Sequence, residues 1–288
     1  MRESWDGTGS IGGADRTSEA VAAHYDDLDV FYREVWGEHV HHGLWRTGRE
    51  DVSTAVRQLV VLVAEKARAT GARVCDVGCG YGATARMLAT EYHAQVTGLT
   101  VSRKQYAYAQ AVDPDASNPV YLQQDWLANT LPDASFDTVV AIESLAHMAD
   151  KAAFFRQARR VLRSEGRLVV CAWLTGDRAR RWQKRWLLEP ICREGRLPGM
   201  GTAADYQRLL EDAGFAVDEV DDLTLQVRKT WSVCMRRVVR GLLTRRVYRR
   251  FLFDRAQPNR VFSLTVPRIW LAYRTGGMGY ALFAARKP

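Results

Sequence analysis

Residues 72–88, ARVCDVGCGYGATARML, pass from a short apolar run through three glycines into a helical pattern. A short apolar run bounded by glycine is typical of a buried strand. Gly78, Gly80 and Gly82 permit a tight turn and let a ligand approach the backbone closely. A strand, a glycine turn and a helix in this order predict a nucleotide-type ligand at the N-terminus of the helix.

The alternation of strand and helix continues along the chain. We expect strands over 72–77, 94–99, 119–124, 136–142 and 167–173, and helices over 82–92, 102–112 and 151–166, the last one capped by Gly166. Segments 215–227 and 276–288 are further strand candidates. Strict alternation predicts an α/β fold with a mostly parallel sheet, helices on both faces, and a ligand at the carboxyl ends of the strands.

The rest of the chain divides around this core. We expect a flexible tail over 1–20, an N-terminal helical lid over 21–70, the cofactor-binding core over 71–176, a substrate-binding helical cap together with part of the core over 177–275, and a final core strand over 276–288. No apolar run is long enough to span a bilayer, and the N-terminus lacks the pattern of a signal peptide. The five cysteines form no ligand-spaced set, so we expect a reduced, cytoplasmic protein.

The net charge of +8 is concentrated near the C-terminal end. No acidic residue lies between Asp222 and Asp254, and segment 236–250 contains seven arginines. Such a segment could bind nucleic acid, an anionic membrane or an acidic substrate. The arginines fall all round a helical wheel, which favours a solvated helix, so we expect no nucleic-acid partner.

Two features separate the ligands that a glycine-rich turn can bind. Gly78, Gly80 and Ala83 also satisfy the dinucleotide pattern G-x-G-x-x-G/A, so the glycines alone do not decide. Asp76 lies two positions before the first glycine, where its charge would repel a pyrophosphate and attract the ammonium of S-adenosylmethionine (SAM). The next strand end, GLTVSRKQ, lacks the carboxylate that NAD needs, although Arg103 could hold the 2′-phosphate of NADP. Asp76 favours SAM, and NADP stays the alternative.

These residues resemble the core of class I SAM-dependent methyltransferases, in particular the γ-tocopherol methyltransferase-like group, which contains many bacterial natural-product methyltransferases. The similar segments are VCDVGCGYGATARMLATEYHAQVTGLTVSRKQ, DWLANTLPDASFDTV, ESLAHMADKAAFF and LPGMGTAADYQRLLEDAGF, with YDDLDVFYREVWGEHVHHGLW at the front. The resemblance implies a seven-stranded, Rossmann-like sheet, a helical lid over SAM, and a methyl transfer to a small molecule.

The resemblance also implies roles for individual residues. The implied SAM-binding residues are Tyr25, Asp76, Gly78, Gly80, Gly82, Thr100, Gln105, Asp125, Trp126 and Glu143. His42 and Trp45 would help Tyr25 to close the site. Several of these have ordinary structural alternatives: Thr100 or Gln105 could cap the helix that starts near Ser102, and Asp125 could be a loop residue beside a core tryptophan.

Two titratable residues are the catalytic candidates. His147 lies four residues beyond the fourth expected strand and has the ordinary pKa of a general base. Glu143 ends that strand and could position the cofactor or pair with an arginine. His39, His41 and His42 suggest a metal at first sight, but they lack a supporting carboxylate, and we expect no metal site.

The acceptor is less constrained. The expected cap is rich in rings, which favours an apolar acceptor. The cap or the N-terminal helices could also form the interface of a homo-oligomer. Its aromatic residues are Trp182, Trp186, Trp231, Tyr248, Phe251, Phe253, Phe262, Trp270 and Tyr273. We therefore predict a SAM-dependent methyltransferase acting on an apolar small molecule, with C-, O- or N-methylation left open. The alternatives are an RNA methyltransferase and a SAM-binding protein repurposed for a cyclisation.

Overall fold

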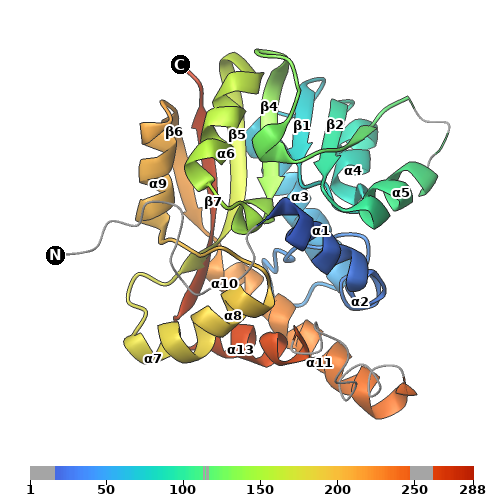
Figure 1. The fold of residues 1–288 in the computed structure, drawn as a ribbon, viewed down its shortest axis with the longest axis vertical. Coiled ribbons are helices and arrows are strands. Elements are labelled where there is room, and N and C mark those ends of the chain that lie inside the picture. Colours follow the sequence, from blue (N-terminus) through green and yellow to red (C-terminus); the bar gives the residue numbers. More distant parts are fainter. Residues whose placement is uncertain (1–16, 113, 115–116, 247–261) are drawn as a thin grey trace.

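The computed structural model describes residues 17–112, 114, 117–246 and 262–288. Its centre is a seven-stranded sheet in the order β3-β2-β1-β4-β5-β7-β6 (Figure 1). The strands are β1 (Arg73–Val77), β2 (Gln95–Thr100), β3 (Val120–Gln123), β4 (Phe136–Ile142), β5 (Leu162–Thr175), β6 (Ala216–Asp222) and β7 (Met278–Arg286). The first five strands pair in parallel, and β7 runs antiparallel to β5 and β6. The expected seven-stranded, mostly parallel, Rossmann-like sheet is confirmed.

The helices follow the alternation that the sequence predicts. In chain order they are α1 (Ser18–Asp27), α2 (Asp29–Val35), α3 (Val52–Ala67), α4 (Ala83–Glu91), α5 (Arg103–Val112), η1 (Trp126–Ala128), η2 (Ser144–His147), α6 (Lys151–Val161), α7 (Arg181–Gln183), η3 (Lys184–Leu188), α8 (Glu189–Glu194), α9 (Ala203–Asp212), α10 (Thr224–Val227), α11 (Lys229–Thr244) and α13 (Phe262–Arg274). None of the helices in the described ranges is both long and apolar enough to cross a bilayer.

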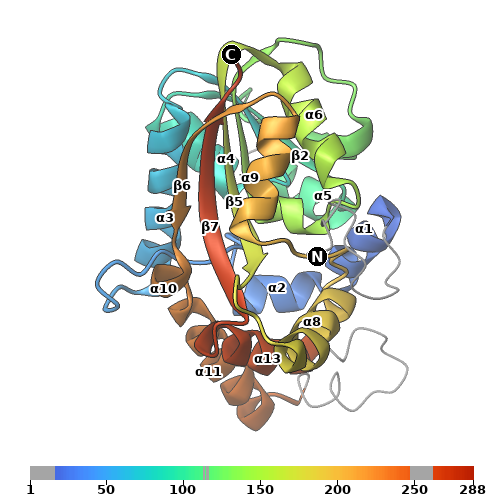
Figure 2. The same cartoon turned by 90° about the vertical axis from the view of Figure 1, so that its left-hand side faces the viewer.

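Side chains that alternate along the strands build a core on each face of the sheet. On β5, Val169 and Cys171 belong to one core, and Leu168 and Val170 belong to the other. Helices α3 and α4 close the first core, whereas α6 and α9 close the second. Figures 1 and 2 show these helix pairs on opposite faces of the sheet. The carboxyl ends of the parallel strands stay free for a ligand.

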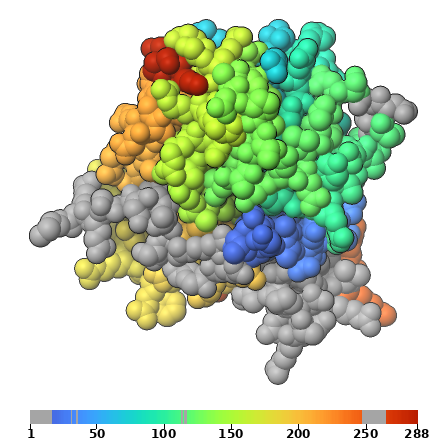
Figure 3. All heavy atoms as spheres, turned by 45° about the horizontal axis from the view of Figure 1, so that its top comes forward, coloured from blue at the N-terminus to red at the C-terminus, as the bar shows by residue number. Residues whose placement is uncertain are grey.

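The first two helices cover those carboxyl ends, and we call α1 and α2 the lid helices (Figure 1). The hydroxyl of Thr17 caps α1 by accepting the N–H of Ala20. In the last turn of α1, the Asp26 carboxylate accepts hydrogen bonds from the Ser102 hydroxyl at 2.5 Å and from the Lys104 N–H at 3.1 Å. These bonds anchor the lid at the N-terminus of α5. Figure 3 shows the blue lid segment lying against the green surface of the core.

A second helical layer lies at the same end of the sheet (Figures 1 and 2). We call α7, η3, α8, α11 and α13 the cap helices. The first three run without interruption from Arg181 to Glu194, and α13 packs on both α8 and α11. The Glu194 carboxylate accepts the Thr265 hydroxyl at 2.6 Å and pairs with Arg268, which ties α8 to α13.

Two expected boundaries are wrong. Helix α6 ends at Val161 rather than at Gly166, because residues 162–175 form one long strand. Gly166 lies inside that strand, where an added Cβ would sit 2.8 Å from the carbonyl oxygen of Arg163, so the glycine serves packing and not a helix cap. The strand expected over 215–227 ends at Asp222, whose carboxylate accepts the N–H of Thr224 at 2.9 Å and begins the turn into α10.

The buried hydroxyl of Tyr81 holds the lid helix α2 against the core, and we expect its removal to destabilise the lid. Tyr81 lies in the turn between β1 and α4 and donates to the Asp29 carboxylate at 2.7 Å, at the start of α2. Tyr81→Phe leaves that carboxylate oxygen short of a donor, and we expect a local cost of about 1–3 kcal/mol. Hydrogen exchange should accelerate in residues 18–36 and stay unchanged in α4. Tyr108→Phe removes a more exposed hydroxyl bonded to Glu38 and serves as the control; equal effects of the two variants would contradict this anchoring.

Candidate active site

The three glycines after β1 adopt positive φ angles for different reasons. An added Cβ at Gly78 (φ +75°) would collide with Ser144, and one at Gly82 (φ +80°) would lie 2.5 Å from the Tyr121 hydroxyl. At Gly80 (φ +56°) no atom lies within 4 Å of the added Cβ. Gly78 and Gly82 therefore let the turn pack closely, and Gly80 faces the open space in which a ligand fits.

Asp76 ends β1 with one oxygen that has no partner. The residue is 2% exposed, and its Oδ2 accepts no hydrogen bond. Burial raises the pKa of Asp76 from 3.8 to about 7, because the charged form has lost its water. A buried carboxylate in this state suits a cationic ligand group that restores its lost partner. The buried Asp76 carboxylate therefore fits the ammonium of SAM.

A cavity of about 160 Å³ opens beside Asp76 and Gly80 and lies between the strand ends, the lid helices and the cap helices. The ionisable carboxylates in its wall are Glu38, Asp76 and Glu143, and none of the described residues that line it is a lysine or an arginine. Glu38 pairs with Arg86, so Glu143 and the ionised form of Asp76 give the cavity its negative charge, in a protein with a formal charge of +8. The remaining wall is mainly apolar, with Val21, Trp36, Met148, Ile191, Leu197, Trp231 and Ile269 among its residues.

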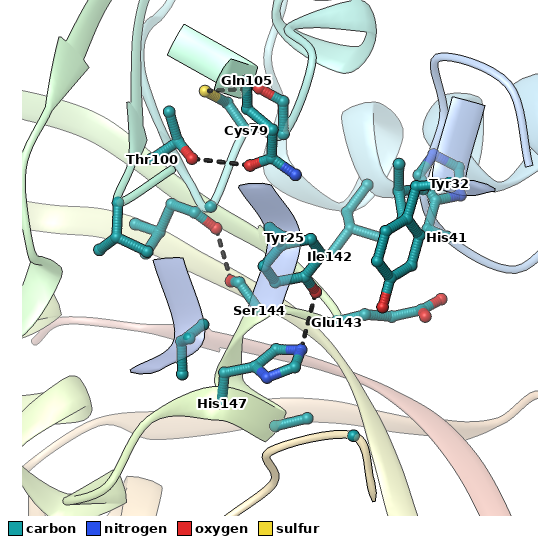
Figure 4. A pocket seen from close by; sticks show the side chains of 18 of the residues that line it. Tyr25, Tyr32, His41, Cys79, Thr100, Gln105, Ile142, Glu143, Ser144 and His147 are labelled. Carbon is teal, nitrogen blue, oxygen red and sulfur yellow. Dashed lines mark hydrogen bonds between the residues drawn. The ribbon is translucent and has the colours of Figure 1, made fainter. Parts of the chain in front are cut away.

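The pair after β2 contributes polar groups to the cavity. The Thr100 hydroxyl donates to Gln105 Oε1 at 2.8 Å, and both residues line the cavity (Figure 4). The cap of α5 is Ser102, whose hydroxyl accepts the N–H of Gln105 at 3.1 Å. The alternative that the Thr100 or Gln105 side chain caps this helix is therefore wrong, and the Gln105 amide N–H₂ stays available to a ligand.

The two candidate residues after β3 differ in their position relative to the cavity. Trp126 is buried, lines the cavity and donates from Nε1 to the Phe154 carbonyl at 3.2 Å. Asp125 does not line the cavity, and its carboxylate caps η1 by accepting the N–H of Leu127 at 2.9 Å. Gly82 is outside the cavity wall as well. The sequence thus placed two residues, Asp125 and Gly82, closer to the ligand space than the structure does.

Glu143 follows β4 in a left-handed conformation (φ +68°) and is held by four donors. Its Oε1 accepts the His42 backbone N–H at 2.7 Å, His42 Nδ1 at 2.9 Å and the Tyr280 hydroxyl at 2.9 Å. Its Oε2 accepts Trp173 Nε1 at 2.7 Å. Burial alone would raise the pKa of Glu143, but its contacts with His42, which include hydrogen bonds from the ring and from the backbone N–H, lower it. Glu143 is therefore a buried anion in the wall of the cavity.

His147 and Tyr25 join the core to the lid across the cavity. The Tyr25 hydroxyl lies 2.8 Å from His147 Nε2, and Figure 4 shows the two side chains pointing at each other. Burial lowers the pKa of His147 to about 3, with the positive field of His24 acting in the same direction. Burial also raises the pKa of Tyr25. The phenol is therefore the donor and the neutral imidazole the acceptor.

The other histidines and Trp45 serve the framework. His42 is buried beneath Glu143 and does not line the cavity, and His41 donates from Nδ1 to the His42 carbonyl at 2.8 Å. Trp45 is bonded through Nε1 to the Thr230 hydroxyl of α11 at 3.0 Å and also lies outside the cavity wall. The expectation that His42 and Trp45 close the site from above is wrong. Among the described residues, no cluster of possible ligands could hold a metal ion.

Sequence reasoning missed the donors that surround Glu143. Trp173 and Tyr280 lie on expected strands and were taken only as strand residues, and Trp231 was one of many aromatic residues in the cap. Trp173 stands near the carboxyl end of β5, directly beside the strand that carries Glu143. An indole N–H at a strand end, next to a carboxylate at the neighbouring strand end, is the signal that could have found it.

The arginine-rich segment is only partly within the described residues. Arg236, Arg240 and Arg245 are exposed, and Arg245 pairs with Glu34 of the lid at 2.9 Å. Positions 247–261, which include Tyr248, Phe251 and Phe253, lie outside the described residues. On α11, Arg236 and Arg240 are exposed, as the sequence predicts, whereas Arg237 is half-buried.

Known proteins share this fold over nearly the whole chain. The family model for mycolic acid cyclopropane synthetase matches residues 13–244. The chain is 30% identical over 285 residues to 27-O-demethylrifamycin SV methyltransferase from Amycolatopsis mediterranei (strain S699), which covers 94% of this chain and 98% of the relative. The solved structure of the 4+2 cyclase SpnF has 27% identity and a TM-score of 0.79 and covers 96% of this chain and 98% of that one. The mycolic acid cyclopropane synthase CmaA1, solved with S-adenosylhomocysteine (SAH) and CTAB, has 22% identity and a TM-score of 0.80, covering 94% and 98%.

The fold, the unpartnered Asp76 and these relatives define a SAM-dependent methyltransferase of small-molecule metabolites. The chain belongs to the mycolic acid cyclopropane synthetase family. The predicted kinship with class I methyltransferases, tocopherol methyltransferases included, is confirmed, and SAM is the cofactor. The dinucleotide alternative is thereby excluded.

We expect substitutions of Gly80 and Gly82 to have different effects, one mainly on cofactor affinity and the other mainly on the stability of the fold. Gly80→Ala places a methyl group in the ligand space and pays about 1–2 kcal/mol for the left-handed backbone. Gly82→Ala adds a collision with Tyr121 to the same backbone cost, so it should destabilise the fold more. We expect calorimetric titration with SAH to show the larger relative loss of affinity in Gly80→Ala, and thermal unfolding to show the larger loss of stability in Gly82→Ala. The reverse order would contradict the assignment.

We expect the substitution Asp76→Asn to have opposite effects on the stability of the cofactor-free protein and on its affinity for SAM. Because the pKa of Asp76 is raised in the folded state, its stabilising contribution is complete below its unfolded value of 3.8 and is lost as the pH rises through about 7. At about pH 8 the cofactor-free Asp76→Asn variant should exceed the original protein in unfolding free energy, by at most about 4 kcal/mol. The same variant should bind SAM more weakly. Denaturant unfolding and calorimetric titration measure the two effects, and a variant that loses both stability and affinity at this pH would refute the argument.

Proposed function

We propose that this enzyme methylates a neutral, largely apolar small molecule, with Asp76 and Gly80 holding the cofactor and His147 near the acceptor. The observation that carries the proposal is the charge of the cavity. Its wall contains the buried carboxylates Asp76 and Glu143 and, among the described residues, no lysine or arginine, and its third carboxylate, Glu38, is paired with Arg86. Such a wall attracts a sulfonium cofactor and repels a phosphorylated or carboxylated acceptor.

Each cofactor-binding residue has a distinct task in this proposal. Asp76 pairs with the ammonium, Gly80 admits the cofactor close to the backbone, and Thr100 with Gln105 offers hydrogen bonds to the ribose. Trp126 gives an aromatic surface for the adenine, and Tyr25 closes the site from the lid. Asp125 and Gly82 support the turns that hold these residues, and Gly78 lets Ser144 pack against the glycine turn.

Methyl transfer needs alignment and the exclusion of water more than covalent help from the protein. SAM supplies an electrophilic methyl group when it is bound. The lid and cap helices contribute side chains to the wall of the cavity and limit the access of water to it. Where the acceptor is a hydroxyl or an amine, His147 Nε2 takes its proton, after the acceptor has replaced the Tyr25 hydroxyl as hydrogen-bond donor. Glu143 stays ionised and holds negative charge in the wall.

The cap helices give the acceptor its apolar contacts. Ile191 lies on α8, and Leu197 lies in the loop after it. Ile269 lies on α13, and Trp231 lies on α11. Thr265 is the polar group that α13 adds to the wall. An apolar acceptor with few polar groups fits these walls. The rifamycin methyltransferase, named for an O-methylation of a natural product, supports an acceptor of similar chemistry.

The similarity to SpnF supports a second candidate, a SAM-bound cyclase. Product analysis separates the two: methyl transfer yields SAH and an acceptor heavier by one methyl group, whereas a cyclase consumes no SAM. An RNA substrate is disfavoured because a phosphate chain would meet the carboxylates of the wall.

Three further expectations belong to this proposal. We propose a cytoplasmic protein, supported by five free cysteines that are all buried. We propose a division into lid, core and cap in which α3 of the expected lid segment and α9 and β6 of the expected cap segment belong to the core. We also propose a homo-oligomer formed through the lid or cap helices. Light scattering of the purified protein measures the last point.

His147 gives the catalytic test. With a neutral hydroxylated acceptor, His147→Ala should lower kcat by about 10²–10⁴-fold, because the proton has no acceptor in the transition state. Its affinity for SAH should change little. Because the pKa of His147 is lowered to about 3, kcat at saturating SAM should show no titration near the ordinary histidine value.

Tyr25→Phe is the matched variant, since it frees His147 Nε2 and keeps both rings. A loss of kcat confined to His147→Ala identifies His147 as the base. A full kcat in His147→Ala would remove that role, and the absence of any methylated product over a panel of neutral acceptors would overturn the proposed function.

A further inference from the structure

Two indole N–H groups join the loop after the lid to the cap helix α11. Trp231 Nε1 lies 2.6 Å from His42 Nε2, and Trp45 Nε1 lies 3.0 Å from the Thr230 hydroxyl. Both tryptophans are buried, at 2% and 6% exposure, and Thr230 and Trp231 are neighbours on α11. The two bonds therefore make a matched pair, of which one reaches the histidine that contacts Glu143.

The bond from Trp231 fixes the protonation state of His42. An indole nitrogen can only donate, so His42 Nε2 must accept and carries no proton. Nδ1 then carries the proton and donates it to Glu143 Oε1 at 2.9 Å. A charged His42 would place its second N–H directly against the N–H of Trp231. His42 is therefore a neutral donor to Glu143, and the contact is a hydrogen bond rather than an ion pair.

Glu143 consequently keeps a full negative charge. All four of its donors, which belong to His42, Tyr280 and Trp173, are neutral. Oε1 accepts three of them and Oε2 accepts one, so Oε2 retains capacity towards the cavity that Glu143 lines.

Among the residues that the structure describes, no other ionisable group that faces Glu143 compensates this charge. On the lid and its loop, burial raises the pKa of Tyr25 and lowers that of His41. On η2, burial lowers the pKa of His147. On the strands β5 and β7 and the cap helices α11 and α13, burial raises the pKa of the groups near Glu143, which are Cys171, Tyr280, Cys234 and Tyr273. Each of these groups is held in its neutral form.

We propose that Trp231 is a positioning residue that keeps His42 neutral, so that the His42–Glu143 pair carries one full negative charge in the wall and favours the sulfonium of SAM over neutral SAH. The inference rests on the proposed cofactor cavity and deepens it. The cap thereby acts on cofactor charge selectivity through one hydrogen bond, in addition to lining the acceptor space.

Without the indole N–H, the pair gains a site for a proton. In Trp231→Phe, His42 Nε2 has no donor opposite it and can be protonated beside the carboxylate, which makes the pair neutral. The proton belongs to the pair as a unit. The attraction for the sulfonium then disappears as the pH falls.

The experiment is a calorimetric titration of the purified protein with SAM and with SAH, from about pH 5.5 to about pH 8.5. The readout is the ratio of the two Kd values, because the titration of Asp76 acts on an amino group that SAM and SAH share. In the original protein the ratio should be independent of pH. In Trp231→Phe it should move towards SAH by about tenfold at the acid end, the effect expected for removing one nearby charge.

Three variants make the result specific. Trp45→Phe removes the matched indole and should leave the ratio independent of pH, although it also costs stability. The double variant Trp231→Phe/His42→Asn keeps a donor towards Glu143 that cannot be charged, and it should restore a flat profile. Glu143→Gln removes the charge directly and should move the ratio towards SAH by about tenfold at every pH; it also serves if Trp231→Phe does not fold.

A flat profile in Trp231→Phe, an equal change in Trp45→Phe, or an unchanged ratio in Glu143→Gln would overturn the inference while leaving the proposed function intact. If the original protein bound neither SAM nor SAH, the cofactor cavity itself would be refuted, and this inference with it.

Discussion

Two carboxylates are buried at the ends of neighbouring parallel strands, and the chemistry of the cavity depends on them. Asp76 lies beside Val140 in the β1–β4 pairing, and Glu143 follows the end of β4. Burying a carboxylate without a partner is costly, so each of them must be compensated. Glu143 is compensated inside the protein by four neutral donors. Asp76 keeps an unpartnered oxygen and a pKa raised to about 7, which leaves its compensation to a cationic ligand.

The lid and the cap complete this arrangement from opposite ends of the sequence. The lid reaches the core through Asp26 and Ser102 and meets His147 through Tyr25. The cap reaches Glu143 through Trp231 and His42. Both layers therefore touch the carboxyl ends of the strands with polar contacts as well as apolar walls. The sheet carries the carboxylates Asp76 and Glu143, and the lid and cap helices, which are added to the α/β core, determine the side chains around these carboxylates.

The sequence predicts the core well because its signals are local. Glycine spacing, strand-helix alternation and Asp76 before Gly78 need no knowledge of distant residues. Gly166 was misread because a glycine after a helical pattern resembles a cap, whereas the long β5 strand needs it for packing. Asp125 caps η1 with one carboxylate oxygen, and its expected contact with the cofactor stays a prediction.

The environment of Glu143 was beyond sequence reasoning for a different reason. Its donors come from the loop after the lid, β5 and β7, and the sequence separation between His42 and Trp231 is 189 residues. No local pattern tells which of many tryptophans has its N–H directed at a particular histidine. Tertiary packing decides this, and it decides the protonation state of His42 with it.

The central claim is that a positively charged protein encloses a negatively charged cavity that selects a cationic cofactor. Parallel calorimetric titrations of the original protein with SAM and with NADPH test it most directly, because both ligands carry an adenosine and differ in the sign of the charge beside it. The account predicts binding of SAM at one site per chain and no binding of NADPH at the same concentrations. Binding of NADPH in competition with SAM, or no binding of SAM, would contradict it.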